Sequence, residues 1–219
     1  MRKMLAAWLM WLLTFAPTAS WAGRYSVFSK SNLANVPANT LPAGFDLQSG
    51  KATASYAGNT LTVKQKSSKA IIDWESFNIG RKATTYFDQQ GKTNWAALNR
   101  IHQNSPSQIL GQLKADGKVY LINQNGVLFG PESQVNVYSL TASTLNISDT
   151  NFLNNNLTFQ AENYADIDGD GELNISDGDY LDNAADYGIR NQGIIAVEQG
   201  GQVFLLGQKV VNEGDISAY

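Results

Sequence analysis

Apolar residues in the first half of this chain fall in short runs between polar, glycine-containing segments, which predicts strands. Residues 52–56 and 60–64 have the composition of β-strands on either side of Gly58-Asn59, a dipeptide that favours a tight turn. A polar stretch over 64–69 then separates them from an apolar strand over 70–74. The pattern predicts an extended, turn-rich beginning of the domain.

The middle of the chain carries a weaker pattern. Residues 94–113 tolerate helix best, although Pro106 and Gly111 limit any helix there to short pieces. From Lys118 onwards the residues are again typical of strands.

Two sequence patterns recur along the chain. Residues 117–122 (GKVYLI) and 201–206 (GQVFLL) both run glycine, polar residue, valine, aromatic residue, leucine and an aliphatic residue. Asn-Gln-Gly-Ile-Ile at 191–195 is followed 21 residues later by Asn-Glu-Gly-Asp-Ile at 212–216. A period in the twenties is typical of solenoids, in which each coil packs its apolar face on the next. Corners of Asn and Gly favour a parallel β-helix, with an antiparallel sandwich as the alternative.

Residues 1–22 have the parts of a cleavable secretion signal. Two basic residues, Arg2 and Lys3, precede a mainly apolar run over 4–15, and residues 20–22 (SWA) place small side chains where a signal peptidase cuts. A membrane anchor is the alternative, but a helical span needs roughly 20 apolar residues. We therefore expect residues 1–22 to be removed and 23–219 to work outside the cytoplasm.

The composition narrows the function further. The 219 residues include no cysteine and one histidine and carry a net charge of −3. Disulfides and cysteine-based metal sites are therefore excluded, and no nucleic-acid partner is expected. A catalytic triad would depend on His102 alone, and the chain has no Gly-x-Ser-x-Gly segment. We expect no enzymatic activity; the alternative is a β-helical enzyme that acts on polysaccharides through paired carboxylates.

Several ordered blocks resemble one known family. They are AIIDWESFNIG at 70–80, LNRI at 98–101, SQILGQL at 107–113, GKVYLINQNGVLFG at 117–130 and VNVYSLTAST at 135–144. In order and spacing they are similar to the amino-terminal secretion domain of two-partner-secreted exoproteins, of which filamentous haemagglutinin is a member. The resemblance covers roughly residues 45–145, and it extends more loosely to the repeats after Arg190.

The resemblance implies an all-β fold over 23–219: a right-handed parallel β-helix with an amino-terminal cap and extra-helical hairpins. It implies that the chain comes from a Gram-negative bacterium. It also implies a partner, an outer-membrane β-barrel transporter of the TpsB type with periplasmic POTRA domains. The domain would be recognised in the periplasm and would seed folding of a downstream passenger region at the cell surface. We expect a monomer that is part of a longer adhesin-type exoprotein. Direct binding of carbohydrate or receptor by this domain is a further alternative.

The family's Asn-Pro-Asn-Gly turn falls on Asn123, Gln124, Asn125 and Gly126. Gln124 replaces the proline, which reduces the rigidity of the turn. Asn125-Gly126 still suits a tight turn. Either the transporter reads this turn directly, or the turn serves only as a corner of the coil.

An acidic insert at about 162–190 departs from the family pattern. It contains nine of the chain's 19 acidic residues. The predicted metal ligands follow the spacing of calcium loops in EF-hands and dockerin modules: Asp166, Asp168, Asp170, Glu172 through its backbone carbonyl, and Asp177. Many hard oxygen ligands on a flexible loop suit Ca²⁺ better than Mg²⁺. We expect a structural calcium site, with a solvated acidic loop as the alternative.

Overall fold

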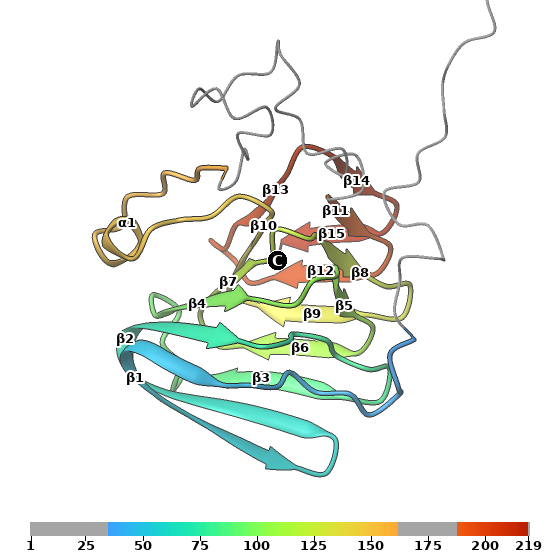
Figure 1. Ribbon diagram of the computed structural model, residues 1–219, viewed down its shortest axis with the longest axis horizontal. Helices are drawn as coiled ribbons and strands as arrows, with labels where there is room; N and C mark the ends of the chain where they lie inside the picture. The colour runs from blue at the N-terminus through green and yellow to red at the C-terminus, as the bar shows by residue number, and fades with distance from the viewer. Residues whose placement is uncertain (1–34, 162–187, 219) are drawn as a thin grey trace, which may run out of the picture.

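The computed structural model describes residues 35–161 and 188–218, which wind into a parallel β-helix (Figure 1). Each coil runs through three faces, here called A, B and C in chain order. Face A comprises β4 (Ala96–Ile101), β7 (Lys118–Ile122), β10 (Ser139–Ser143), β13 (Val203–Leu206) and the second half of β2 (Thr60–Trp74). Face B comprises β5 (Ser107–Ile109), β8 (Val127–Phe129), β11 (Ile189–Asn191) and β14 (Val210–Asn212). Face C comprises β3 (Thr84–Asp88), β6 (Gln112–Ala115), β9 (Gln134–Val137), β12 (Ile194–Val197) and β15 (Asp215–Ala218).

The strand register explains the sequence repeats. Asn191 pairs with Asn212 in parallel on face B, so the 21-residue spacing is the length of one coil. The other repeat joins β7 and β13, which both pair in parallel with β10 on face A. The parallel β-helix is therefore confirmed. The antiparallel sandwich is wrong, because every strand pair within the described residues is parallel except that of β1 and β2.

An antiparallel hairpin caps the amino-terminal end of the coils. Strand β1 (Asp46–Ala57) pairs along its length with β2, and Gly58 at the connecting turn has a positive φ of 55°. The hairpin occupies an edge that would otherwise expose unpaired backbone groups. Contrary to the prediction, the polar stretch at 64–69 does not interrupt the strand. It forms a corner at which β2 passes from face C to face A, where buried Gln65 donates to the carbonyl of Ala96 at 3.1 Å.

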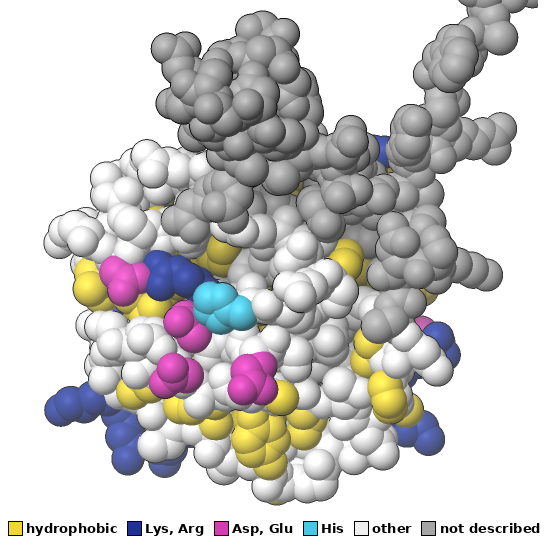
Figure 2. Space-filling model, in the orientation of Figure 1, with side chains coloured by type: hydrophobic (Ala, Val, Ile, Leu, Met, Phe, Trp, Pro, Cys, Tyr) yellow, Lys and Arg dark blue, Asp and Glu magenta, His cyan; other side chains and the backbone are white. Residues whose placement is uncertain are grey.

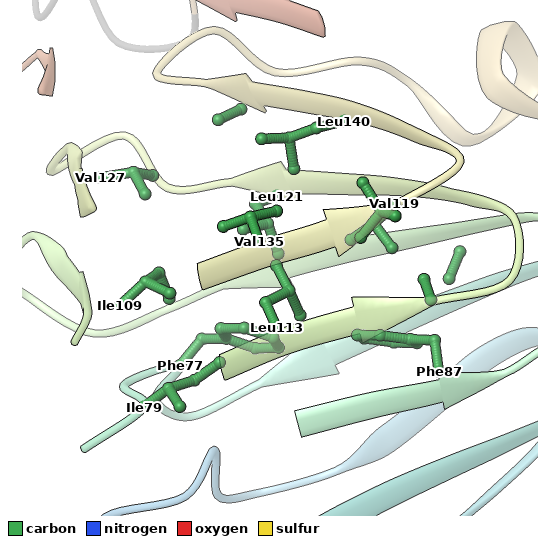
Figure 3. Packing of buried hydrophobic residues seen from close by; sticks show 14 of the residues in the cluster. Phe77, Ile79, Phe87, Ile109, Leu113, Val119, Leu121, Val127, Val135 and Leu140 are labelled. Carbon is green, nitrogen blue, oxygen red and sulfur yellow. The ribbon is translucent and has the colours of Figure 1, made fainter. Parts of the chain in front are cut away.

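The interior of the helix is filled by inward-facing apolar side chains (Figure 3). Trp74, Phe77 and Phe87 are fully buried, whereas Trp95 is half-buried. The ring of Trp74 meets that of Phe77 edge-on at 5.4 Å, and its indole nitrogen donates to the buried Asn99 Oδ1 at 2.9 Å. The buried carboxamide of Asn99 on β4 thus finds its hydrogen-bond donor within the core.

The prediction of short helical pieces within 94–113 is wrong. This segment forms β4, β5 and β6, because the parallel pairing of β4 with both neighbouring coils outweighs the helix propensity of its alanines and leucine. Within the described residues the α-helix is α1 (Asp149–Leu153), which begins after the cap residue Ser148. No helix in this part of the chain is long and apolar enough to cross a membrane. The predicted secretion signal at 1–22 lies outside the described residues.

Candidate functional site

The corner between faces A and B varies most from coil to coil. In four coils it is formed by residues 75–78, 102–106, 123–126 and 207–209, and in the coil after β10 its described residues are 144–161 and 188. One of these corners is the turn that the sequence predicts as a site, and the next contains the long insert. The candidate site is therefore built around this edge of the helix.

Residues 123–126 form a tight turn between β7 and β8. The Gly126 N–H donates to the Asn123 carbonyl at 2.9 Å. Gly126 has a φ of 101°, and a Cβ atom there would lie 2.7 Å from the Gly188 carbonyl oxygen of the next coil. Only glycine suits this position, for both the backbone angle and the lack of space.

Asn123 is fully buried, and its carboxamide holds two corners together. Its Oδ1 accepts the Asn125 N–H at 2.8 Å. Its Nδ2 donates to the Ser105 carbonyl at 3.1 Å and to Ser107 Oγ at 2.9 Å, both in the preceding coil. All of these bonds are internal, so Asn123 stabilises the stack of corners and is not presented on the surface of the folded domain.

Gln124 and Asn125 are half-buried and lie at the surface. The Asn125 Nδ2 donates to the Gln103 carbonyl at 2.8 Å. Gln103 in turn accepts the Phe77 N–H through its own Oε1 at 2.9 Å, which ties three successive corners together. The four predicted residues therefore divide into a buried pair, Asn123 and Gly126, and a surface pair, Gln124 and Asn125.

The surface pair borders a polar hollow of about 280 Å³. The hollow is lined by Arg100, Ile101, His102, Asn104, Ile122, Gln124, Asn125 and Asn146. Figure 2 shows the chain's one histidine on this face beside basic and acidic side chains. His102 Nε2 lies 3.5 Å from Asp73 Oδ2, and the His102 side chain is mostly exposed. Carboxamides that both donate and accept, beside a guanidinium group, suit neutral polar groups such as peptide amides.

The predicted calcium ligands, Asp166, Asp168, Asp170, Glu172 and Asp177, lie outside the described residues. Within the part of the chain that the structure describes, no group of three or more His, Asp or Glu side chains is placed to hold a metal ion. The Asn123 N–H donates to the Ser143 carbonyl at 3.0 Å, and the Val127 N–H donates to the Gly188 carbonyl at 3.0 Å. The end of β10 and the residue before β11 therefore both lie against the predicted turn.

Sequence reasoning missed two contacts that join face A to the segment after β10. Arg100 lines the hollow and also binds Asp149, and Lys69 reaches across face A to α1. Both contacts join residues far apart in the chain. The only local signal was Ser148 followed by Asp149, a combination typical of a helix start.

Comparisons with known proteins agree with this architecture. Two heme/hemopexin-binding proteins of Haemophilus influenzae match the chain. One is 35% identical over 181 residues, which are 83% of this chain and 18% of that protein. The other is 46% identical over 84 residues, 38% of this chain and 9% of that protein. The chain thus spans less than a fifth of the length of these relatives. The crystal structure of the HMW1 secretion domain from Haemophilus influenzae matches with a TM-score of 0.66 and 35% identity, covering 81% of this chain and 42% of that one.

The chain is a capped parallel β-helix that is similar to a solved secretion domain. Its class is therefore that of secretion domains. The family model described as TPS secretion domain matches residues 38–218, and the chain belongs to that family of two-partner secretion domains. The predicted parallel β-helix and the predicted assignment to two-partner secretion domains are thereby confirmed.

Proposed function

We propose that an outer-membrane β-barrel transporter recognises this domain on the periplasmic side and that the domain then nucleates β-helix folding at the cell surface. The observation that carries the proposal is the extent of the family match. It begins at residue 38, before the cap, and includes every described coil to residue 218. The family match therefore covers the cap and all the described coils, which supports a role for the domain as a whole.

The stacking of coils supports a role in nucleation. Val119 and Leu121 of β7 are fully buried, because coils lie on both sides of them. Val203 and Leu205, at the equivalent inward positions of β13, are only half-buried. A further coil stacked on β13 would complete their burial, at about 25 cal/mol for each Å² of apolar surface removed from water. Folding outside the cell would therefore favour outward movement of the chain without ATP.

Within the predicted turn, we assign recognition to the surface pair Gln124 and Asn125, and coil stability to the buried pair. The support is the difference in burial together with the position of the surface pair at the polar hollow. Its carboxamides would bind backbone amide groups of an extended transporter segment.

The test of this assignment is co-expression with a candidate transporter. Gln124→Ala is expected to lower the amount of chain in the medium, and the urea midpoint of the purified protein, measured alongside, separates this loss from a loss of stability. The matched control is Gln134→Ala, which changes an exposed carboxamide on face C that does not line the hollow. Unchanged secretion of the Gln124→Ala variant would remove direct recognition from the turn.

For the acidic insert we propose a structural Ca²⁺ site formed by Asp166, Asp168, Asp170, Glu172 and Asp177. The support is the spacing of these residues. Calcium at millimolar concentration is expected to raise the melting temperature of the chain, and Asp168→Asn is expected to weaken this rise. A melting temperature that chelator does not change, together with no calorimetric binding, would contradict the site.

A further inference from the structure

Residues 144–161, here called the latch, leave the coil at the corner after β10 and fold back on themselves. Asn146 and Gln160 exchange two backbone N–H to carbonyl bonds, both of 2.8 Å. The loop between them, which contains α1, therefore starts and ends at the same corner. Its contacts with face A are made by side chains and by backbone carbonyls of the latch, and none of them belongs to a parallel strand pair.

The latch covers an apolar stripe on the outer side of face A. Ile71, Leu98 and Tyr120 occupy the same register position on three neighbouring strands and are all buried. Phe152 of α1 packs onto them, with its ring edge-on to that of Tyr120 at 5.4 Å. Phe204 occupies the same register column two strands further on and is 41% exposed. In the folded chain, Phe152 of the latch therefore covers the apolar stripe on β2, β4 and β7.

Two cationic side chains hold the latch at the two ends of α1. Arg100 pairs with Asp149 at the start of α1 and donates to the Ile147 carbonyl at 2.7 Å. The Lys69 Nζ donates to the Phe152 carbonyl at 2.8 Å, and it lies 5.5 Å from the centre of the Phe152 ring. The last contact joins residues 83 positions apart, whereas one coil takes only 21.

We propose that the latch closes over face A after β10 has joined the coil, and that its closure locks the cap and the first coils into their folded stack. This role rests on the proposed secretion function: a chain that leaves the transporter unfolded would be held outside once residue 152 had bound β2. Before closure, the strands of face A pair only with neighbouring strands and expose the apolar stripe. After closure, a contact bridges β2, β4 and β7 at once.

The first test measures local opening by amide hydrogen exchange in the purified chain. Phe152→Ala is expected to speed exchange in α1 and in β4 and β7 by about a hundredfold, with little change in β9 and β12 of face C. Phe204→Ala is the matched control, since it removes an aromatic ring from the same column outside the latch. Phe152→Leu is expected to restore most of the protection. Equal acceleration in all strands, or none, would overturn the latch as a separate unit.

The second test measures transport. With the transporter present, Phe152→Ala is expected to reduce the secreted amount several-fold relative to the Phe204→Ala chain. Secretion equal to that of the unchanged chain would overturn the locking role. Failure of the unchanged chain to be secreted would instead contradict the proposed secretion function, while the exchange measurement would still decide whether the latch exists. The two failures are therefore distinguishable.

Discussion

Replacing Asn123 with alanine tests whether the predicted turn is a structural corner. The substitution removes three internal hydrogen bonds, to the Asn125 N–H, the Ser105 carbonyl and Ser107 Oγ. A hydrogen bond contributes about 1 kcal/mol net, and buried partners left unsatisfied cost at least as much. The expected loss is about 3 kcal/mol of unfolding free energy, or roughly a hundredfold in the folding equilibrium constant.

Urea denaturation of the purified chain measures this loss as a shift in midpoint at constant slope. Asn104→Ala provides the control, because it deletes an exposed carboxamide on the neighbouring corner and is expected to change stability by less than about 0.5 kcal/mol. A loss below about 1 kcal/mol for Asn123→Ala would refute the reasoning that the Asn123 carboxamide holds the stacked corners together.

Further predictions concern the turn, the core and the cap side of face C. Gly126→Ala is expected to cost at least about 1–2 kcal/mol in urea denaturation, because a left-handed backbone angle is combined with a close approach to the next coil. Trp74→Phe is expected to cost about 1–3 kcal/mol by the same measurement, since the buried Asn99 loses the indole donor. Burial, followed by the hydrogen bond to Asp116 and nearby carboxylate charge, raises the pKa of Tyr86 to about 12. The pKa of Tyr86 is thus higher in the folded chain than in the unfolded chain. The contribution of its protonated hydroxyl to folding stability is therefore present below pH 10 and is lost as the pH rises towards 12. An ultraviolet titration of tyrosinate that shows no late-ionising group, or an unchanged curve for Asp116→Asn, would contradict this assignment.

The β-helix was predictable because each coil repeats a local pattern of Asn and Gly corners with inward apolar residues, and the period is visible in sequence. The strands within 94–113 were not predictable, because the alanines and leucine of this segment suit a helix equally well. Only pairing with neighbouring coils makes the segment extended. The latch was missed for a related reason. Its helix has five residues, and it is held by contacts of Phe152, Asp149 and backbone carbonyls with distant residues of face A.

For the candidate turn, the sequence identified the right corner but not the division of roles within it. Two asparagines with identical side chains differ only in what surrounds them. Asn123 points into the preceding coil and is fully buried, whereas Asn125 lies at the edge of a hollow. Burial of this kind depends on coil stacking, which no short motif encodes.

The most direct test of the central claim is sufficiency for export. Residues 1–218 would be joined to a reporter that does not otherwise leave the periplasm and co-expressed with the partner transporter, or with a transporter whose barrel is blocked. The account predicts reporter in the medium only with the active transporter. It also predicts loss of that secretion when the cap hairpin, β1 and the first half of β2, is deleted. Reporter that stays in the periplasm with the active transporter, or reaches the medium equally without it, would contradict the claim that this capped β-helix is the secretion domain.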